Sequence, residues 1–190
     1  MERTRCPWCE GDELYTAYHD TEWGIPLKDD LKLFELLLLE GAQAGLSWIT
    51  ILKRRDSYRR AFSKMNPEKI ARYTEKDVER LMGDAGIIRN RRKIHSAIEN
   101  ARAFLAMQEE GQAFSRWLWD WVEGEPVVNR FRTMQEIPAS TDLSERVSRE
   151  LKKKGFSFVG PTIMYAYMQS AGLVNDHLTG CFRHPDNGKL

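Results

Sequence analysis

The chain has 190 residues and a formal net charge of +1, and 42% of its residues are hydrophobic. Such a chain can bury the core of one globular unit without disulfide bonds. Its longest leucine run, Leu36–Leu39, falls far short of the roughly 20 apolar residues that cross a membrane, and Met1–Cys6 lacks the apolar segment of a signal peptide.

We therefore expect a cytoplasmic protein with no membrane partner. Its three cysteines are then thiols or metal ligands rather than disulfides. The small net charge does not indicate a polyanionic partner, and each basic group alone is typical of a solvated helix face. Three such groups beside predicted turns modestly favour phosphate contacts: Lys53–Arg55 with Arg59 and Arg60, Arg89 with Arg91–Lys93, and Lys152–Lys154.

The first 28 residues look irregular and are rich in cysteine, histidine and aromatic side chains. After them, apolar periodicity predicts helices over residues 33–40, 48–62, 67–73, 75–82, 87–107, 114–122, 141–154 and 161–171. Capping signals support several of these boundaries: Asp29 or Asp30, Ser47, Pro67, Thr74 with Asp77, and Gly155. No segment alternates as a strand would, so we predict an all-α fold.

The segment Leu33–Trp48 begins as a helix that is apolar nearly all round, which is typical of a buried element. Glu40 stands at its predicted end, where the helix dipole and burial are both unfavourable for a carboxylate. Gly41 and Gly45 are expected to break the helix before Trp48. The pattern fits a pocket wall for a cationic ligand, and it equally fits a core helix whose Glu40 pairs with an arginine.

Five side chains at the two ends of the chain suit a metal site. His177 and Cys181 stand four residues apart, on one side of a helical turn, while Cys6, Cys9 and His19 lie near the start. A closed structural zinc site takes four cysteine or histidine ligands, so one of these five would be spare. Such a site would tie the two ends of the chain together.

Other interpretations of these residues stay open. The histidines could be structural and the cysteines buried hydrophobes, so spacing favours zinc only slightly. The Cys6–Cys9 pair also fits a thiol oxidoreductase, although the strand and βαβ pattern of that class are missing. His95 and His184 have no nearby partners in sequence, and we expect them on the surface.

The turn in Leu81–Ile88 lies between two predicted helices and precedes the basic stretch Arg89–Lys93. A glycine-containing hairpin that opens a helix exposes main-chain N–H groups and can bind an anion. With basic residues one turn further on, it could hold a DNA phosphate without reading sequence. By itself, a plain helical hairpin is the preferred interpretation.

Aromatic residues surround Glu40 in the sequence: Trp8, Tyr15, Tyr18, Trp23 and Trp48. Aromatic rings with one carboxylate suit a flat cationic heterocycle, which they bind by stacking, cation–π attraction and a charged hydrogen bond. Aromatic residues more often fill cores, which is our interpretation of Trp117, Trp119 and Trp121.

At these residues the chain resembles the 3-methyladenine DNA glycosylase I family, bacterial alkylation-repair enzymes of the helix-hairpin-helix superfamily. The resemblance covers essentially the whole chain, and its motifs are specific only when taken together. They are Leu14-Tyr15, Tyr18–Asp20, Glu22–Gly24, Leu39–Gly41, Ala44–Trp48, Asp84–Arg89, Lys154–Phe156, Phe158–Gly160 and Gly172–His177.

The resemblance implies one all-α glycosylase unit over residues 1–190. Its helix-hairpin-helix core would span about residues 29–170, and residues 1–28 and 171–190 would form a terminal subdomain held by one structural zinc. The family pattern puts the zinc ligands at Cys6, His19, His177 and Cys181, which leaves Cys9 spare. We expect no iron–sulfur cluster.

The resemblance also implies the base pocket and its chemistry. The pocket maps onto Glu40, Tyr18 and Trp48, with Trp8 and Tyr15 as walls. Glu40 would be the catalytic residue, holding the flipped base as an anion. Because 3-methyladenine in DNA is cationic, its glycosidic bond is already weak and needs little acid–base help. The family lacks the aspartate that most helix-hairpin-helix glycosylases carry after the hairpin, and we find no counterpart here.

DNA contacts follow from the same resemblance. Gly45 and Leu46 match the loop that probes the gap left by a flipped nucleotide, and the family's hairpin maps onto the turn at Gly86. Arg89 and Lys93 follow that turn and are predicted to contact DNA. The implied enzyme is a monofunctional N-glycosidic hydrolase that acts as a monomer on alkylated double-stranded DNA and releases free 3-methyladenine.

Two rival functions remain at this stage. A non-catalytic, zinc-stapled DNA-binding module would share the hairpin and the basic groups, but it would not need Glu40 ringed by aromatic residues. A binding protein for small cationic heterocycles would bind free 3-methyladenine and ignore DNA. Release of a base from methylated DNA separates both from a glycosylase.

Overall fold

The computed structural model describes residues 3–187. The α-helices are α1 Glu13–Thr21, α2 Asp30–Gln43, α3 Trp48–Leu52, α4 Arg55–Ala61, α5 Pro67–Ile70, α6 Glu75–Met82, α7 Arg91–Glu109, α8 Phe114–Trp119, α9 Asp142–Lys153 and α10 Pro161–Ser170. Short 3-10 helices are η1 Pro7–Cys9, η2 Ser63–Met65, η3 Asp120–Val122, η4 Met134–Glu136 and η5 Pro185–Asn187, and the strands are β1 Val127–Val128 and β2 Val174–Asn175.

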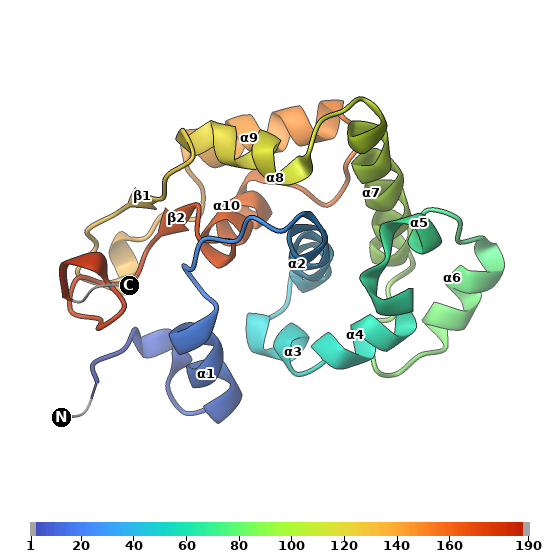
Figure 1. Ribbon diagram of the computed structural model, residues 1–190. Coiled ribbons are helices and arrows are strands. Elements are labelled where there is room, and N and C mark those ends of the chain that lie inside the picture. Colours follow the sequence, from blue (N-terminus) through green and yellow to red (C-terminus); the bar gives the residue numbers. More distant parts are fainter. Residues whose placement is uncertain (1–2, 188–190) are drawn as a thin grey trace.

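Helix α2 lies at the centre of the molecule and packs against α3, α7, α8 and α10 (Figure 1). Its apolar residues are buried on several sides, as the sequence predicts for a helix without a polar face. The hydroxyl of Tyr167 on α10 donates to the carbonyl oxygen of Leu33 at 3.0 Å, which satisfies the only polar atom of that buried side chain. The helix that carries Glu40 is thus held by several neighbouring helices.

The mostly helical fold confirms the predicted class, with one exception. Strands β1 and β2 form a two-residue parallel pair in which Val127 opposes Val174 and Val128 opposes Asn175. The prediction of no strands was wrong, because a two-residue strand is too short to show alternation. The backbone pairing of β1 with β2 holds the segment after η3 beside the segment after α10.

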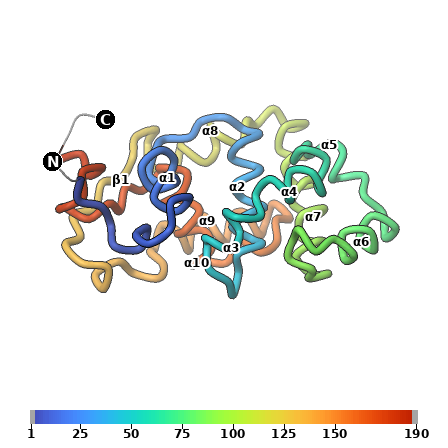
Figure 2. Tube along the Cα trace, turned by 90° about the horizontal axis from the view of Figure 1, so that it is seen from below, coloured from blue at the N-terminus to red at the C-terminus, as the bar shows by residue number. Residues whose placement is uncertain are grey.

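The first and last described segments lie on the same side of the molecule, beside α1 and the strands (Figures 1 and 2). The amide of Phe182 donates to the carbonyl oxygen of Thr4 at 2.9 Å, so the first and last described segments are joined directly. Helices α4 to α7 occupy the opposite end of the molecule. Within residues 3–187, no helix is long and apolar enough to cross a membrane.

Several predicted helix boundaries are confirmed. Asp29 caps α2, Pro67 is the first residue of α5, and Thr74 with Asp77 forms a capping box on α6. Gly155 follows α9 with a φ of +90°, the conformation expected just beyond a helix end. These signals are local, which is why the sequence alone locates them.

Several helix predictions were wrong. The first 28 residues were expected to be irregular, but they contain η1 and the helix α1, which the Asp12 side chain caps. Gly41 does not end α2, which continues to Gln43, with Phe158 packed beside Gly41. The predicted helix over residues 48–62 is two helices, α3 and α4, that meet at Lys53. Helix α7 begins at Arg91 instead of residue 87, since the amide of Ile88 leaves the helical pattern and donates to the Tyr58 hydroxyl at 3.1 Å.

Candidate active site and metal cluster

A cavity of about 220 Å³ opens between α1, α2, α3, α10 and the loop that precedes α9. The structure brings five predicted base-binding residues together around it: Trp8, Tyr15, Tyr18, Glu40 and Trp48. Trp23, Gln43, Met134, Ile137, Ala166, Gln169 and Ser170 complete the lining. The cavity is therefore aromatic and apolar, with one carboxylate and a few amide and hydroxyl groups.

Glu40 is buried in the last turn of α2, with 2% of its surface exposed. Its Oε1 atom accepts a hydrogen bond of 2.7 Å from the Ser170 hydroxyl, at the end of α10. Burial raises the pKa of this carboxyl group to about 8, and the hydrogen bond from Ser170 opposes that rise only in part. Among residues 3–187, Glu40 has no arginine counter-ion of the kind that the core-helix interpretation requires, and its side-chain hydrogen-bond partner is the neutral Ser170 hydroxyl.

Unpartnered polar atoms mark this cavity as a binding site. Among residues 3–187, the few buried side-chain atoms without a hydrogen-bond partner include the Tyr18 hydroxyl, Oε2 of Glu40 and Nε1 of Trp48. Burial raises the pKa of Tyr18 well above its ordinary value, so its hydroxyl keeps its proton. The cavity thus holds two hydrogen-bond donors and one carboxyl oxygen without partners. A ligand that forms hydrogen bonds with these atoms would offset the free-energy cost of burying them.

The aromatic walls are preassembled. The rings of Trp8 and Tyr15 have centroids 4.8 Å apart, and those of Trp8 and Trp23 lie 5.0 Å apart. On the other side, the rings of Tyr18 and Trp48 are 5.6 Å apart. Because α1 places Tyr15 and Tyr18 three residues apart, both point from one helix face toward the cavity. A flat ring could stack here without rearranging the walls.

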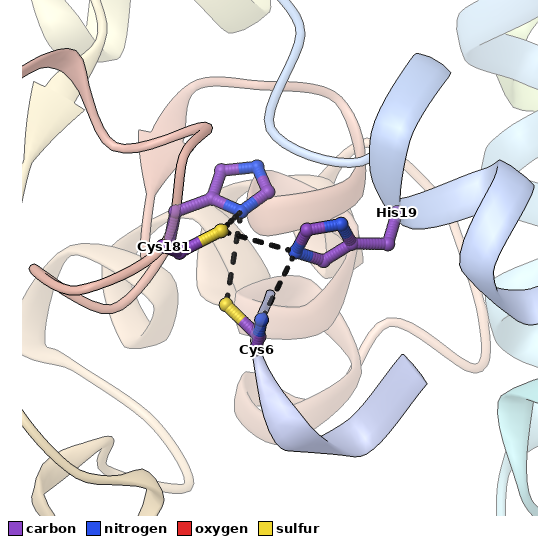
Figure 3. Close-up of side chains that lie close together, drawn as sticks. Cys6, His19 and Cys181 are labelled. Carbon is purple, nitrogen blue, oxygen red and sulfur yellow. Dashed lines mark hydrogen bonds between the residues drawn. The ribbon is translucent and has the colours of Figure 1, made fainter. Parts of the chain in front are cut away.

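The Cys/His cluster lies next to this wall. Cys6, His19, His177 and Cys181 are buried, and their donor atoms all lie within 4.8 Å of one another (Figure 3). Sγ of Cys181 is 3.4 Å from Nε2 of His19 and 3.6 Å from Nδ1 of His177, which is also 3.8 Å from Sγ of Cys6. A tetrahedral zinc with Cys and His ligands has donor separations of about 3.3–3.8 Å, and these three separations fall in that range.

The surroundings of the cluster also suit a metal. The second nitrogen of His19, Nδ1, lies 2.8 Å from Oδ1 of Asp20, and the second nitrogen of His177, Nε2, lies 3.1 Å from the Trp23 carbonyl oxygen. Partners of this kind orient metal-bound imidazoles. A hydrogen bond between the two thiols lowers the pKa of Cys181 and raises that of Cys6, so a metal bound by both sulfurs would have to displace the Cys6 proton.

Two predictions about neighbouring residues have different outcomes. Cys9 is outside the four-residue cluster, and its thiol donates to the Cys6 carbonyl oxygen at 3.1 Å, which agrees with its role as the spare cysteine. The prediction that His184 lies on the surface was wrong. His184 is fully buried, and its Nε2 lies 3.1 Å from the Asn129 carbonyl oxygen, a contact that no local pattern indicates. His95 is half-buried, 3.5 Å from Glu75.

Some of the residues predicted to contact DNA are exposed, whereas others contact the rest of the protein. Gly45 and Leu46 form an exposed tip after α2, and Leu46 leaves 41% of its surface uncovered. Arg89 is exposed in the hairpin between α6 and α7. Gly86 packs against Ser57 so closely that an added Cβ would lie 2.9 Å from the Cβ of Ser57. Lys93, by contrast, donates to the carbonyl oxygens of Ala42 and Ala44.

Comparison with known proteins decides the family. The sequence profile of the methyladenine glycosylase family matches residues 8–184. This chain belongs to that family. DNA-3-methyladenine glycosylase 1 of Escherichia coli K12 is 54% identical over 183 residues, which are 96% of this chain and 98% of the relative.

Solved structures of methyladenine glycosylases agree with this assignment. A crystal structure of 3-methyladenine DNA glycosylase I superposes with a TM-score of 0.94 at 53% identity, covering 96% of this chain and all of the other. A variant of such an enzyme in complex with 3-methyladenine gives a TM-score of 0.91 at 36% identity, over 95% of this chain and 97% of the other.

Sequence reasoning missed part of the lining of this methyladenine glycosylase cavity. Ser170 and Gln169 end an apolar helix, and two polar residues at that point were the available signal. Met134 and Ile137 come from a loop that carries no recognisable motif. Only the tertiary fold brings these residues to Glu40.

The raised pKa of Glu40 predicts how stability depends on pH. The folded protein holds this proton up to about pH 8, whereas an ordinary glutamate releases it near 4.5. The protonated Glu40 therefore contributes fully to the free energy of unfolding below about pH 4.5, and this contribution is lost as the pH rises to about 8. Glu40→Gln removes the effect, so the variant should gain stability over the parent by about 1.4 kcal/mol per pH unit across this window.

Urea unfolding between these pH values measures the difference. Glu35→Gln is the control on the same helix, because the Glu35 carboxylate is paired with Arg59 at 2.9 Å. A parent and a Glu40→Gln variant with parallel pH profiles would show that Glu40 does not carry the shifted proton.

Proposed function

We propose that this chain excises 3-methyladenine from alkylated double-stranded DNA by hydrolysing the N-glycosidic bond, leaving an abasic site. The observation that carries the proposal is Glu40, a buried carboxyl group with an unpartnered oxygen in an aromatic cavity. The family supports the reaction class, and a similar enzyme has been solved with 3-methyladenine bound.

Recognition of the base rests on Glu40, Tyr18 and Trp48. An enzyme acting on a base must take it out of the stack, and the cavity then receives a flat cationic ring. The charge of the methylated base replaces the missing counter-ion of Glu40, so the carboxyl group gives up its proton and binds as an anion. Trp8 and Tyr15 stack beside the ring, and an uncharged adenine gains no such ion pair.

Bond cleavage needs little further help from the protein. A cationic base is already a good leaving group, so its glycosidic bond is weak before binding. Interactions stronger in the transition state than in free DNA then supply the acceleration. Glu40 fits this role because it gains its partner only when the flipped, charged base is in place.

The exposed tip and the hairpin form the DNA-binding surface in this proposal. Leu46 enters the gap that the flipped nucleotide leaves, and Gly45, with a φ of +77°, shapes that tip. The hairpin at Gly86 and the exposed Arg89 hold the phosphate backbone without reading sequence. Lys93 follows the same hairpin, but its Nζ atom donates to the carbonyl oxygens of Ala42 and Ala44.

A structural zinc completes the proposal. Cys6, His19, His177 and Cys181 would hold it, and it supplies no step of the reaction. Its contribution is architectural, because Cys6 is two residues from Trp8 and His19 is next to Tyr18 in the chain. A metal that fixes those ligands also fixes two walls of the cavity.

Excision from methylated DNA tests the proposal directly. The parent protein should release 3-methyladenine, identified by chromatography of the free bases. Glu40→Gln should slow the single-turnover rate by roughly 10- to 100-fold, the worth of a hydrogen bond to a charged group. Glu35→Gln, on the same helix but paired with Arg59, should keep the parent rate.

The alternatives have distinct outcomes in this assay. If free 3-methyladenine binds but none leaves DNA, the chain is a small-molecule binding protein. Binding to DNA without base release would make it a non-catalytic module. Equal rates for the parent and Glu40→Gln would remove Glu40 from the mechanism.

Metal content tests the zinc proposal separately. Elemental analysis should find about one zinc per folded chain. Cys181→Ser should lose the zinc and unfold at a lower temperature, because a ligand is removed from a closed site. Cys9→Ser is the matched control and should keep it, since Cys9 lies outside the cluster. Loss of zinc in Cys9→Ser but not in Cys181→Ser would reassign the ligands.

A further inference from the structure

Lys93 joins two parts of the molecule that the proposed function uses together. It lies in the first turn of α7, and its Nζ atom donates to the carbonyl oxygen of Ala42 at 2.8 Å and to that of Ala44 at 2.7 Å. Both acceptors are main-chain groups at the end of α2, the helix that carries Glu40. The ammonium group therefore turns into the protein instead of toward solvent.

One end of this link is the exposed tip. Ala44 is the last residue before Gly45 and Leu46, and it leaves the helical conformation at a φ of −42° and a ψ of 117°. The carbonyl groups at a helix end have no partners within the helix, and the helix dipole makes this end negative. A cation that donates to two of these carbonyls sets the direction in which the chain leaves α2.

The other end of the link is the hairpin. Asn90 caps α7 by accepting from the Lys93 amide at 3.2 Å. Two residues before Asn90, the amide of Ile88 donates a hydrogen bond to the Tyr58 hydroxyl. In the same hairpin, the Ala85 carbonyl oxygen accepts a hydrogen bond of 3.2 Å from Arg54. The main chain around Lys93 is thus part of the same rigid unit as Gly86 and Arg89.

We propose that Lys93 is a positioning residue for base flipping: through Ala42 and Ala44 it holds the Leu46 tip at a fixed place relative to the phosphate-binding hairpin. The inference rests on the proposed function. A protein that pushes a side chain into the duplex must do so at a set distance from the phosphates it grips. Lys93 supplies that rigid connection without touching the base or the phosphates.

Partial burial supports this role over a direct phosphate contact. The pKa of Lys93 is lowered by desolvation, so its charge is already partly removed from water. Turning it outward would break two short hydrogen bonds and leave two carbonyl groups of α2 unpaired. Arg89, which is exposed, faces no such cost.

The test measures binding to a duplex with one abasic-site analogue, where no base needs to be removed and the tip fills an existing gap. Lys93→Met should weaken this binding about tenfold, and Leu46→Ala should do likewise. The double variant should be no weaker than Leu46→Ala alone, since Lys93 acts through the tip. Lys28→Met is the matched control, because Lys28 also donates to a main-chain carbonyl oxygen, that of Gly124, and carries the same charge.

Two further readouts separate positioning from other roles. The affinity of Lys93→Met for free 3-methyladenine should equal that of the parent, which shows an intact pocket. The slope of log affinity against log salt should also be unchanged. A slope reduced by about one phosphate contact, or effects that add in the double variant, would show direct phosphate binding and overturn the proposal.

The remaining outcomes also decide the question. If Lys93→Met also weakens binding of free 3-methyladenine, Lys93 stabilises the whole pocket. If Lys93→Met binds DNA as tightly as the parent protein, Lys93 has no role in DNA binding. Either result overturns the inference. Release of 3-methyladenine by the parent protein is measured separately, so failure of the proposed function would be recognised on its own.

Discussion

A buried carboxyl group without a counter-ion is the constraint on which the rest of this structure depends. Glu40 lies in the central helix, 2% exposed, and within the described part of the chain its side-chain hydrogen-bond partner is the Ser170 hydroxyl. Keeping a carboxylate there costs several kcal/mol unless a cation arrives or the group stays protonated. With a pKa raised by burial to about 8, the Glu40 carboxyl group stays protonated at neutral pH when no cation is near it. A cationic base reverses that balance, which makes charge the property that the pocket selects.

The N-terminal segment builds the other side of the pocket, and the Cys/His cluster brings the C-terminal segment against it. In the chain, Trp8 is two residues from the cluster residue Cys6, and Tyr18 is next to the cluster residue His19. The position of the cluster therefore constrains two walls of the cavity. The contact between Phe182 and Thr4 reinforces this closure from outside. Packing at the ends of a chain is ordinarily weak, and a metal that ties four side chains is a compact way to fix it.

Much of this arrangement could be predicted from the sequence, and the failures have physical causes. Capping residues such as Asp29 and Thr74 act within one helical turn, so their helix starts were predictable. The break between α3 and α4 and the late start of α7 depend on partners far away in the chain, such as the Tyr58 hydroxyl that binds Ile88. Gly41 was mistaken for a helix end because a glycine inside a buried helix has the same local signal as a glycine that ends one.

The site shows the same division. The predicted base-binding and metal-ligating residues came together because family motifs carry information about distant contacts, whereas spacing alone favoured zinc only slightly. Ser170 and Met134 were missed because nothing near them in sequence indicates Glu40. Lys93 was predicted as a surface contact from its charge. Its burial against the end of α2 could be found only in three dimensions.

The central claim is that Glu40 must give up its proton to hold the cationic base. The most direct measurement is the pH dependence of kcat/KM for excision from methylated DNA, because this quantity reports groups in the free enzyme. For the parent, kcat/KM should rise with pH and level off above about 8, and for Glu40→Gln it should be low and flat over the same range. A parent profile that is flat near pH 8, or one that Glu40→Gln reproduces, would contradict the account.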